Sequence, residues 1–267
     1  MRNFKKFLLS FDFSANNPWR IFVFQLIAGV GLIFHIFNSG RTEWIFCVTV
    51  YFLINILGGT ITYHRLLTHK SFKPYTWFTY VGPLLGTLIG AGSTIAWVAN
   101  HREHHQYADK PKDPHSPHNK PWYKIQWGSM FHKPRIKYAT DLLRSPFHLF
   151  LHKYYWLIHL VYICALFLIS PSAVIFVYLA PAALAWNASS LVNVVNHFKV
   201  FGYRNFDTPD MSVNNVFTAL LVGGEGYHNN HHAKPLSYSF SQKWYEFDLS
   251  AYIIRFFLSS KPVVTKS

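Results

Sequence analysis

Charge and cysteine are both scarce in this chain. Only 13% of the 267 residues are charged, and 11 acidic residues stand against 25 basic ones. The only cysteines, Cys47 and Cys164, each lie inside an apolar stretch. We therefore expect two buried thiols and no disulfide pair. The first residues lack a continuous apolar core and a small-residue cleavage site, so a secretory signal is not expected there.

The sequence contains several long runs of apolar residues. Hydrophobic residues make up 51% of the chain and aromatic residues 19%. Nearly uncharged blocks occupy residues 21–37, 44–62, 75–98, 154–169 and 173–195. A helix needs roughly 20 mostly apolar residues to cross a bilayer, and a soluble protein would break up so many long runs. The sequence predicts an integral membrane protein.

The excess of positive charge, +14 in total, is unevenly placed. Ten Lys or Arg residues lie between Arg102 and Lys153, whereas the turn at Ser170 and Pro171 holds none. The positive-inside rule places this middle segment and the C-terminal tail in the cytoplasm. Because no nucleic-acid module is visible, we expect the basic surface to face anionic membrane lipids or an acidic protein partner.

Histidines gather in three clusters. These are "HRLLTH" (His64, His69), "HREHH" (His101, His104, His105) and "HNNHH" (His228, His231, His232). On an α-helix, positions i, i+3 and i+4 share a face, so each H-x-x-H-H is predicted to aim three imidazoles at one point. His64 and His69 are about 140° apart on a helix. They could share a centre only if the helix ends between them, or they could serve two neighbouring metals.

Packed imidazoles need metal ions. Eight of them would repel one another as cations or bury unsatisfied nitrogens, which costs several kcal/mol. A metal ion removes both problems by binding one nitrogen of each neutral ring. Eight ligands exceed the four of a tetrahedral zinc site, so two metals are predicted. All-imidazole ligation without thiolates favours iron over zinc or copper.

The isolated histidines are assigned other roles. We expect core or interfacial positions for His35, His148, His152 and His159, and the cytoplasmic surface for His115, His118 and His132.

The clusters must also reach one side of the membrane, so an even number of crossings must separate them. A single apolar block, 75–98, separates the first two clusters, and Pro83, Gly86 and Gly90 interrupt it. We expect this block to be interfacial or re-entrant. The sequence thus predicts one all-α membrane domain over residues 1–267, with a cytoplasmic histidine-bearing cap, both termini in the cytoplasm, and four transmembrane helices at about 20–37, 44–63, 153–170 and 173–196.

These residues resemble the motifs of a known family. From about Thr62 to Pro235 the chain is similar to the membrane-bound fatty acyl desaturases, in particular the Δ9, stearoyl-CoA desaturase-like type. The matching elements are "HRLLTH", Trp97 four residues before the second box, Asp109, Asp113, Pro114 and His115 after it, "NVVNH", "GYRNF" and "GEGYHNNHH".

The resemblance implies two iron ions bound by nine histidines, with an asparagine that approaches one iron through water. The implied ligands are His64, His69, His101, His104, His105, His197, His228, His231 and His232, and the asparagine is Asn193. It also implies an enzyme that uses O2 and two electrons to introduce a cis double bond, at Δ9, into an acyl-CoA or acyl-lipid chain. Electrons are expected from a separate ferredoxin or b-type cytochrome. The membrane would be a bacterial inner membrane or the endoplasmic reticulum.

Further residues are expected around this site. Asp109, Asp113 and Glu225 are candidates to accept the free N–H of the imidazoles, and solvated or capping residues are the alternative reading. Trp97 is expected to line the acyl channel or to pack as a core aromatic.

One departure from the family concerns the head of the substrate. Members that use acyl-CoA carry an Arg-Lys pair at the positions of Phe131 and His132. Here the nearby basic residues are Lys133, Arg135 and Lys137. We expect these three to bind an anionic head group, or else to serve only as positive-inside charge.

Two other functions fit parts of the pattern. A di-iron membrane hydroxylase of fatty acids or alkanes would share eight of the histidines. A metal transporter would need ionisable residues inside the spans, where the apolar blocks offer almost only His35 and His159.

Overall fold

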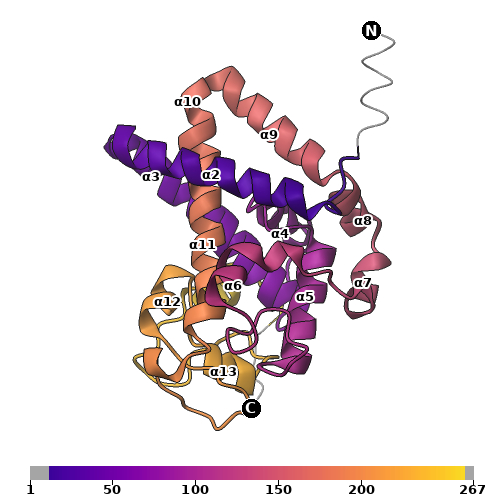
Figure 1. Ribbon diagram of the computed structural model, residues 1–267, viewed down its shortest axis with the longest axis vertical. Coiled ribbons are helices and arrows are strands. Elements are labelled where there is room, and N and C mark those ends of the chain that lie inside the picture. The colour runs from indigo at the N-terminus through magenta and orange to yellow at the C-terminus, as the bar shows by residue number, and fades with distance from the viewer. Residues whose placement is uncertain (1–11, 262–267) are drawn as a thin grey trace.

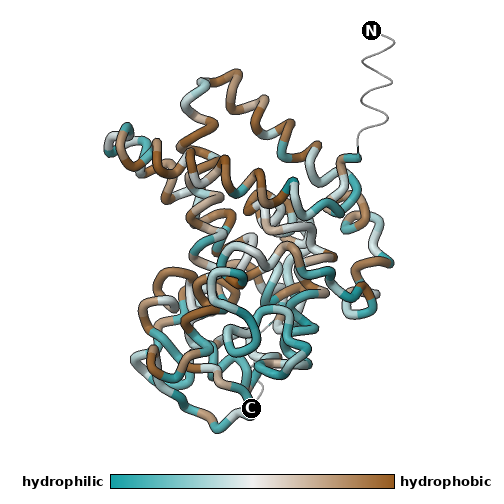
Figure 2. The backbone as a smooth tube through the Cα atoms, viewed as in Figure 1, coloured by the Kyte–Doolittle hydropathy of each residue, from teal (hydrophilic) through white to brown (hydrophobic). Residues whose placement is uncertain are grey.

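The computed structural model describes residues 12–261 of the chain. Long helices form one end of the molecule, and a lobe of short helices and loops, here called the cap, forms the other (Figure 1). The upper helices are largely apolar, whereas the cap contains most of the polar segments together with some apolar ones (Figure 2). Residues 12–261 contain helices and isolated bridges but no extended strand. The all-α prediction is confirmed.

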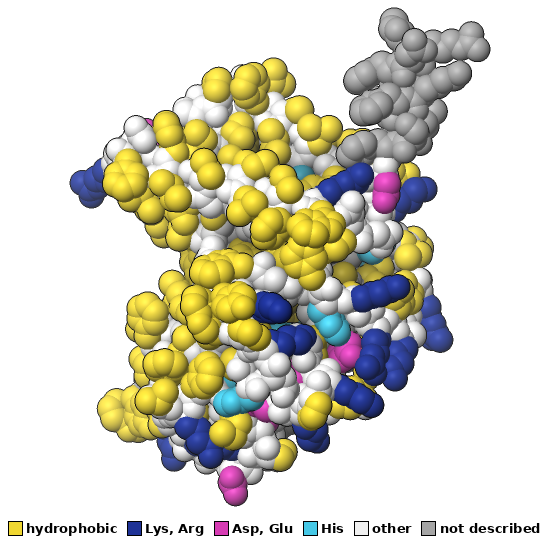
Figure 3. Space-filling model, in the orientation of Figure 1, with side chains coloured by type: hydrophobic (Ala, Val, Ile, Leu, Met, Phe, Trp, Pro, Cys, Tyr) yellow, Lys and Arg dark blue, Asp and Glu magenta, His cyan; other side chains and the backbone are white. Residues whose placement is uncertain are grey.

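In the described part of the chain, three helices are long and apolar enough to cross a membrane. The first is α2 (Pro18–Asn38), and the second, Arg41–Thr68, joins α3 (Arg41–Tyr51) to a π-helical segment, η1 (Phe52–Thr68). The third, Pro171–Val195, is made of α10 (Pro171–Ala173), η4 (Val174–Leu179) and α11 (Ala180–Val195). Their apolar side chains cover the upper part of Figure 3.

The fourth expected span, 153–170, is built differently. Helix α9 (Tyr155–Ile169) is short, and α8 (Pro146–Lys153) precedes it at an angle of 68°. Together the two helices make a fourth candidate span, so residues 12–261 contain three or four. Cys164 of α9 is exposed, so its expected burial is wrong, because no residue within 12–261 covers its side chain; Cys47 is buried.

The block 75–98 is divided into two helices, α4 (Phe78–Thr87) and the first part of α5 (Thr94–Tyr107). Gly90 and Gly92 in the connection have positive φ angles of 77° and 96°, a conformation that glycine adopts most readily. At 1.5 Å per residue α4 is about 15 Å long, half of a hydrocarbon core of about 30 Å. Because α4 packs on η1, the chain folds back at this point and delivers α5 to the cap.

The cap holds the remaining short elements. These are α6 (Trp122–Gly128), η2 (Ser129–Phe131), η3 (Ile136–Ala139), α7 (Thr140–Leu143), η5 (Lys199–Phe201), α12 (Val216–Leu221), α13 (His228–Ala233), α14 (Leu249–Ile253) and η6 (Ile254–Leu258). The histidines of the clusters, and His197, lie on or directly after η1, α5, α11 and α13. These segments meet in the cap.

Candidate metal centre

Nine buried or half-buried histidines form two groups in the cap. The first group is His64, His69, His101, His105 and His231, and the second is His104, His197, His228 and His232. Within each group one nitrogen of every ring lies within 4.8 Å of the others. All nine histidines that the sequence singled out are therefore brought together.

The two H-x-x-H-H clusters do not each serve one point, so that prediction is wrong. His101 and His105, at i and i+4, join the first group, whereas His104, at i+3, joins the second. In the other cluster His231, at i+3, is the ring that separates from His228 and His232. Positions i+3 and i+4 differ by about 100° around a helix. That angle is enough to direct one ring of each cluster to the neighbouring group.

His64 and His69 share the first group, with ring centroids 4.8 Å apart. The helix ends at Thr68, and His69 donates its backbone N–H to the carbonyl of His64 at 3.2 Å. This i→i+5 bond is the π-helical pattern, which brings residues five apart closer to one face than an α-helix would. The first sequence alternative, in which the helix ends between them, is the one observed.

Four of the imidazole rings donate a hydrogen bond from Nδ1–H to a carboxylate. His64 donates Nδ1–H to Glu225, His104 to Asp113 (2.9 Å), His197 to Asp109 (2.8 Å) and His232 to Asp210 (3.0 Å). Such partners fix the tautomer and orientation of a metal-binding imidazole. The predicted positions of Asp109, Asp113 and Glu225 next to the histidines agree with this geometry.

The charges of these acids depend on the imidazoles. Burial acts to raise the pKa of Asp109, but hydrogen bonds from His197 and Ser116 outweigh it and lower the pKa to about 2. In the same way His104 and His115 keep the pKa of Asp113 well below its usual range despite burial. Burial, together with neighbouring histidines, lowers the pKa of His101 and His228. The acids are thus anionic and these rings neutral.

The Nε2 atoms of neighbouring rings face one another at short distances in both groups. In the second group His104 and His232 donate their Nδ1–H to Asp113 and Asp210. The Nε2 atoms of the two neutral rings therefore carry no hydrogen, and they lie only 3.3 Å apart. In the first group Nε2 of His231 lies 2.9 Å from that of His105 and 3.0 Å from that of His64. Converging lone pairs repel unless a cation lies between them. The donor sets therefore fit one metal ion in each group.

Three features were not found from the sequence. Asp210 lies 22 residues from His232, and no motif spacing connects them. His115, expected at the surface, is buried and stacks on His104 at 4.2 Å; that expectation is wrong because Asp113 accepts the His115 backbone N–H at 2.9 Å and turns the ring inward. Arg65, which is fully buried, joins Glu225 (3.1 Å) to Asp248 (2.9 Å).

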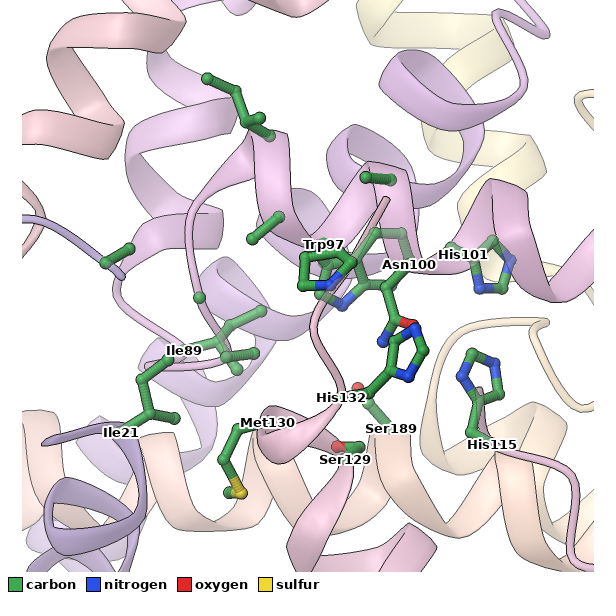
Figure 4. Close-up of a pocket in the computed structure, with 18 of the residues that line it drawn as sticks. Ile21, Ile89, Trp97, Asn100, His101, His115, Ser129, Met130, His132 and Ser189 are labelled. Atoms are coloured by element: carbon green, nitrogen blue, oxygen red, sulfur yellow. The ribbon is translucent and has the colours of Figure 1, made fainter. Parts of the chain in front are cut away.

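A cavity of about 700 Å³ adjoins the metal groups. His64, His101 and His228 line one part of it, and apolar residues such as Ile21 and Ile89 line another. Figure 4 shows His101 and His115 at one end and Ile21 and Ile89 at the other. The cavity thus leads from the metal groups into an apolar pocket, here called the acyl cavity.

Two further predicted residues lie on its wall. Trp97 lines the acyl cavity and stacks on His101 at 5.0 Å. Asn193 lines it as well, together with His228.

The three predicted head-group residues have different surroundings. Lys133 lines the acyl cavity. Arg135 forms an ion pair with the buried Glu103 at 2.9 Å, and the Lys137 amine lies over the Tyr138 ring at 5.0 Å. They do not form one cluster around the cavity.

Comparisons with known proteins agree with this site. The family model described as fatty acid desaturase matches residues 42–261. The chain is 35% identical over 206 residues to an sn-1 stearoyl-lipid 9-desaturase of Anabaena variabilis, covering 75% of each chain. It is 34% identical over 228 residues to an acyl-CoA C20 Delta5-desaturase of Anemone leveillei, covering 81% of this chain and 71% of the relative. Histidine groups, apolar helices and these matches lead to one conclusion: the chain belongs to the fatty acid desaturase family and is an oxidoreductase that desaturates fatty acyl chains.

Proposed function

We propose that the enzyme introduces a cis double bond at position 9 of a saturated acyl chain, with two iron ions held by the nine histidines. The position is supported by relatives named as 9-desaturases, from Anabaena variabilis and a Nostoc strain. All-imidazole donor sets without thiolates support iron. The overall reaction takes two hydrogens from adjacent methylenes and, with O2, two electrons and two protons, yields an alkene and two waters.

One observation carries the proposal: residues of both histidine groups line the wall of a cavity that also has an apolar part. His64, His101 and His228 line the acyl cavity. When bound, iron supplies the activation of O2 that no side chain provides for an unactivated methylene. The chain's own residues position the acyl group, hold each ring through its carboxylate and exclude bulk water. Asn193 is proposed to reach the metal beside His228 through a water.

The carrier and the electron donor belong to the same proposal. Relatives are named as acyl-lipid and as acyl-CoA desaturases, so the acyl group is proposed to arrive on a lipid or on CoA. Electrons are proposed to come from a separate ferredoxin or b-type cytochrome. We place the cap and both termini in the cytoplasm, at a bacterial inner membrane or the endoplasmic reticulum, because the basic residues gather there.

Expression in a host that lacks desaturation, followed by double-bond localisation in its lipids, tests the proposal. We expect a cis double bond at position 9. His104→Ala and His231→Ala, one from each group, should abolish product while leaving the protein in the membrane. Elemental analysis after anaerobic iron loading should give two irons for the parent chain. Hydroxylated lipid instead of alkene would favour the hydroxylase reading.

A further inference from the structure

Carboxylate contacts are divided unequally between the two histidine groups. The second group has three of them, at His104, His197 and His232, and the first group has one, at His64. Within residues 12–261, no hydrogen bond or ion pair joins the other four rings of the first group to a carboxylate; these are His69, His101, His105 and His231. Other contacts must therefore hold these rings in position for a metal ion.

His69 is the member of the first group that lies outside a helix. Helix η1 ends at Thr68, one residue before it, whereas the other four rings lie within η1, α5 and α13. Lys70, directly after His69, has a φ angle of 52°, in the left-handed region that residues other than glycine rarely adopt. The turn at His69 and Lys70 therefore needs contacts that hold it.

Arg102 supplies such contacts. The last carbonyls of a helix lack backbone donors within the helix, and here two of them accept hydrogen bonds from the Arg102 guanidinium. Nη2–H donates to the carbonyl of Leu67 at 2.6 Å, and Nε–H donates to that of Thr68 at 3.0 Å. Arg102 directly follows His101 on α5. The guanidinium thus joins the end of η1, next to His69, to the helix that carries two other rings of the first group.

Asp141 of α7 holds the same guanidinium on its other side. Its two oxygens accept from Nη1–H at 2.8 Å and from Nη2–H at 3.1 Å, and the Tyr138 carbonyl accepts the second Nη1–H at 2.8 Å. All five N–H groups of Arg102 are therefore used. Asp141 also pairs with the Lys70 amine at 2.7 Å, so these contacts reach both sides of His69. We call Arg102 and Asp141 the His69 clamp.

We propose that the His69 clamp positions His69 for the metal ion of the first group. The inference rests on the proposed two-metal centre and adds to it a positioning residue, Arg102, that belongs to neither histidine group. The ring centroids of His69 and His105 lie 4.6 Å apart across the junction that the clamp holds. Metal–ligand distances are fixed to within about 0.2 Å, so a small shift of the turn weakens binding. Lysine does not reproduce the planar fork of arginine at such a site.

Stepwise binding of Co²⁺ to the metal-free full chain, in detergent and without O2, tests the proposal. The visible spectrum of bound Co²⁺ reports its ligands, and His69→Ala and His197→Ala identify the signals of the first and the second group. Arg102→Gln is compared with Arg135→Gln. The control also removes an arginine that pairs with an acid, Glu103 at 2.9 Å, but this arginine contacts neither side of His69. Because no turnover is needed, the result does not depend on whether the proposed reaction occurs.

We expect Arg102→Gln to bind the first-group ion about 10- to 100-fold more weakly, as is typical when the support of a metal ligand is lost. The second-group ion should bind as in the parent chain. Arg102→Lys, which keeps the charge, should show a smaller loss at the same group, and it serves as the test if Arg102→Gln does not fold. Parental binding in both Arg102 variants, an equal loss at both groups, or the same loss in Arg135→Gln would overturn the proposal. A parent chain that binds fewer than two ions would contradict the two-metal centre itself, and the proposal with it.

Discussion

Asp210 is the carboxylate that the tertiary structure adds to the histidine site. Its Oδ2 accepts the Nδ1–H of His232 at 3.0 Å. Burial acts to raise the pKa of Asp210, but this contact outweighs burial and keeps the pKa well below its usual range. Removing its charge by Asp210→Asn should weaken the hold on His232. Loss of such a partner typically lowers metal affinity by about 10- to 100-fold.

Competition with a graded chelator, followed by elemental analysis, measures this loss. Asp207→Asn provides the control, because Asp207 is exposed and lies three residues earlier in the same loop. If the two variants hold metal equally well, Asp210 does not support His232.

Arg65 is the second residue whose role is testable by itself. It is fully buried, donates to Glu225 and Asp248, and lies over the Phe240 ring at 4.0 Å. Arg65→Met would leave two buried carboxylates without their cation, which costs roughly 3–5 kcal/mol. The unfolding midpoint of the metal-free protein in detergent should therefore fall markedly. Arg255→Met, at an exposed site on η6, should leave it nearly unchanged, and a similar midpoint in both variants would contradict the argument.

At the scale of elements, close packing of α4 on η1 depends on glycine. A Cβ at Gly58 would lie 2.4 Å from the backbone nitrogen of Gly86, so Gly58→Ala must push the two helices apart. Overpacking of this kind typically costs about 1–3 kcal/mol. Gly29→Ala in α2 is the matched control, since a Cβ there meets nothing within 4 Å.

Thermal unfolding of the two alanine variants measures the difference. We expect Gly58→Ala to be destabilised, and Gly29→Ala to be neutral or slightly more stable because alanine favours a helix. A stable Gly58→Ala protein would mean that α4 can move away from η1 without cost.

Helix α4 also decides the topology. Because α4 is too short to cross and the chain turns at Gly90 and Gly92, we predict that residues 1, 112 and 267 all face the cytoplasm. Tags at both termini and a cysteine at Lys112, introduced after Cys47 and Cys164 are changed to serine, can be probed with a membrane-impermeant reagent. An external signal from Lys112 alone would show that residues 75–98 cross the membrane.

At the scale of the whole molecule, the acyl cavity joins α2, η1, α5 and α11 into one substrate path. Ala91 lines this cavity and packs against the apolar core. Ala91→Phe should fill part of the space and shift the products towards shorter acyl chains, since each methylene that loses its burial costs about 0.8 kcal/mol. Product chain lengths, measured by gas chromatography, report the shift.

Ala165→Phe supplies the control for cavity filling. Ala165 is exposed on α9, so the same substitution there should leave the product lengths unchanged. An identical product profile in the two variants would exclude Ala91 from the acyl path.

Local patterns in the sequence determined a large part of this protein. Apolar runs of about 20 residues predict membrane helices because the bilayer sets that length. Histidine clusters with no thiolate partner predict a metal site because ligand chemistry is a property of side chains. Eight of the nine histidines in the two groups stand in these clusters, whereas the ninth, His197, was implied only by the resemblance to the desaturase family. Three of the four carboxylates were candidates from the sequence.

Only the tertiary structure decided how these residues are divided and which others join them. The assignment of His104 and His231 to different groups from their neighbours depends on the rotation of α5 and α13 against each other. Asp210 accepts a hydrogen bond from His232, 22 residues away in the sequence, and Glu103 forms an ion pair with Arg135. The periodicity of a helix can be recognised in consecutive residues of the sequence. Contacts between distant segments arise from packing, and no fixed spacing in the sequence predicts them.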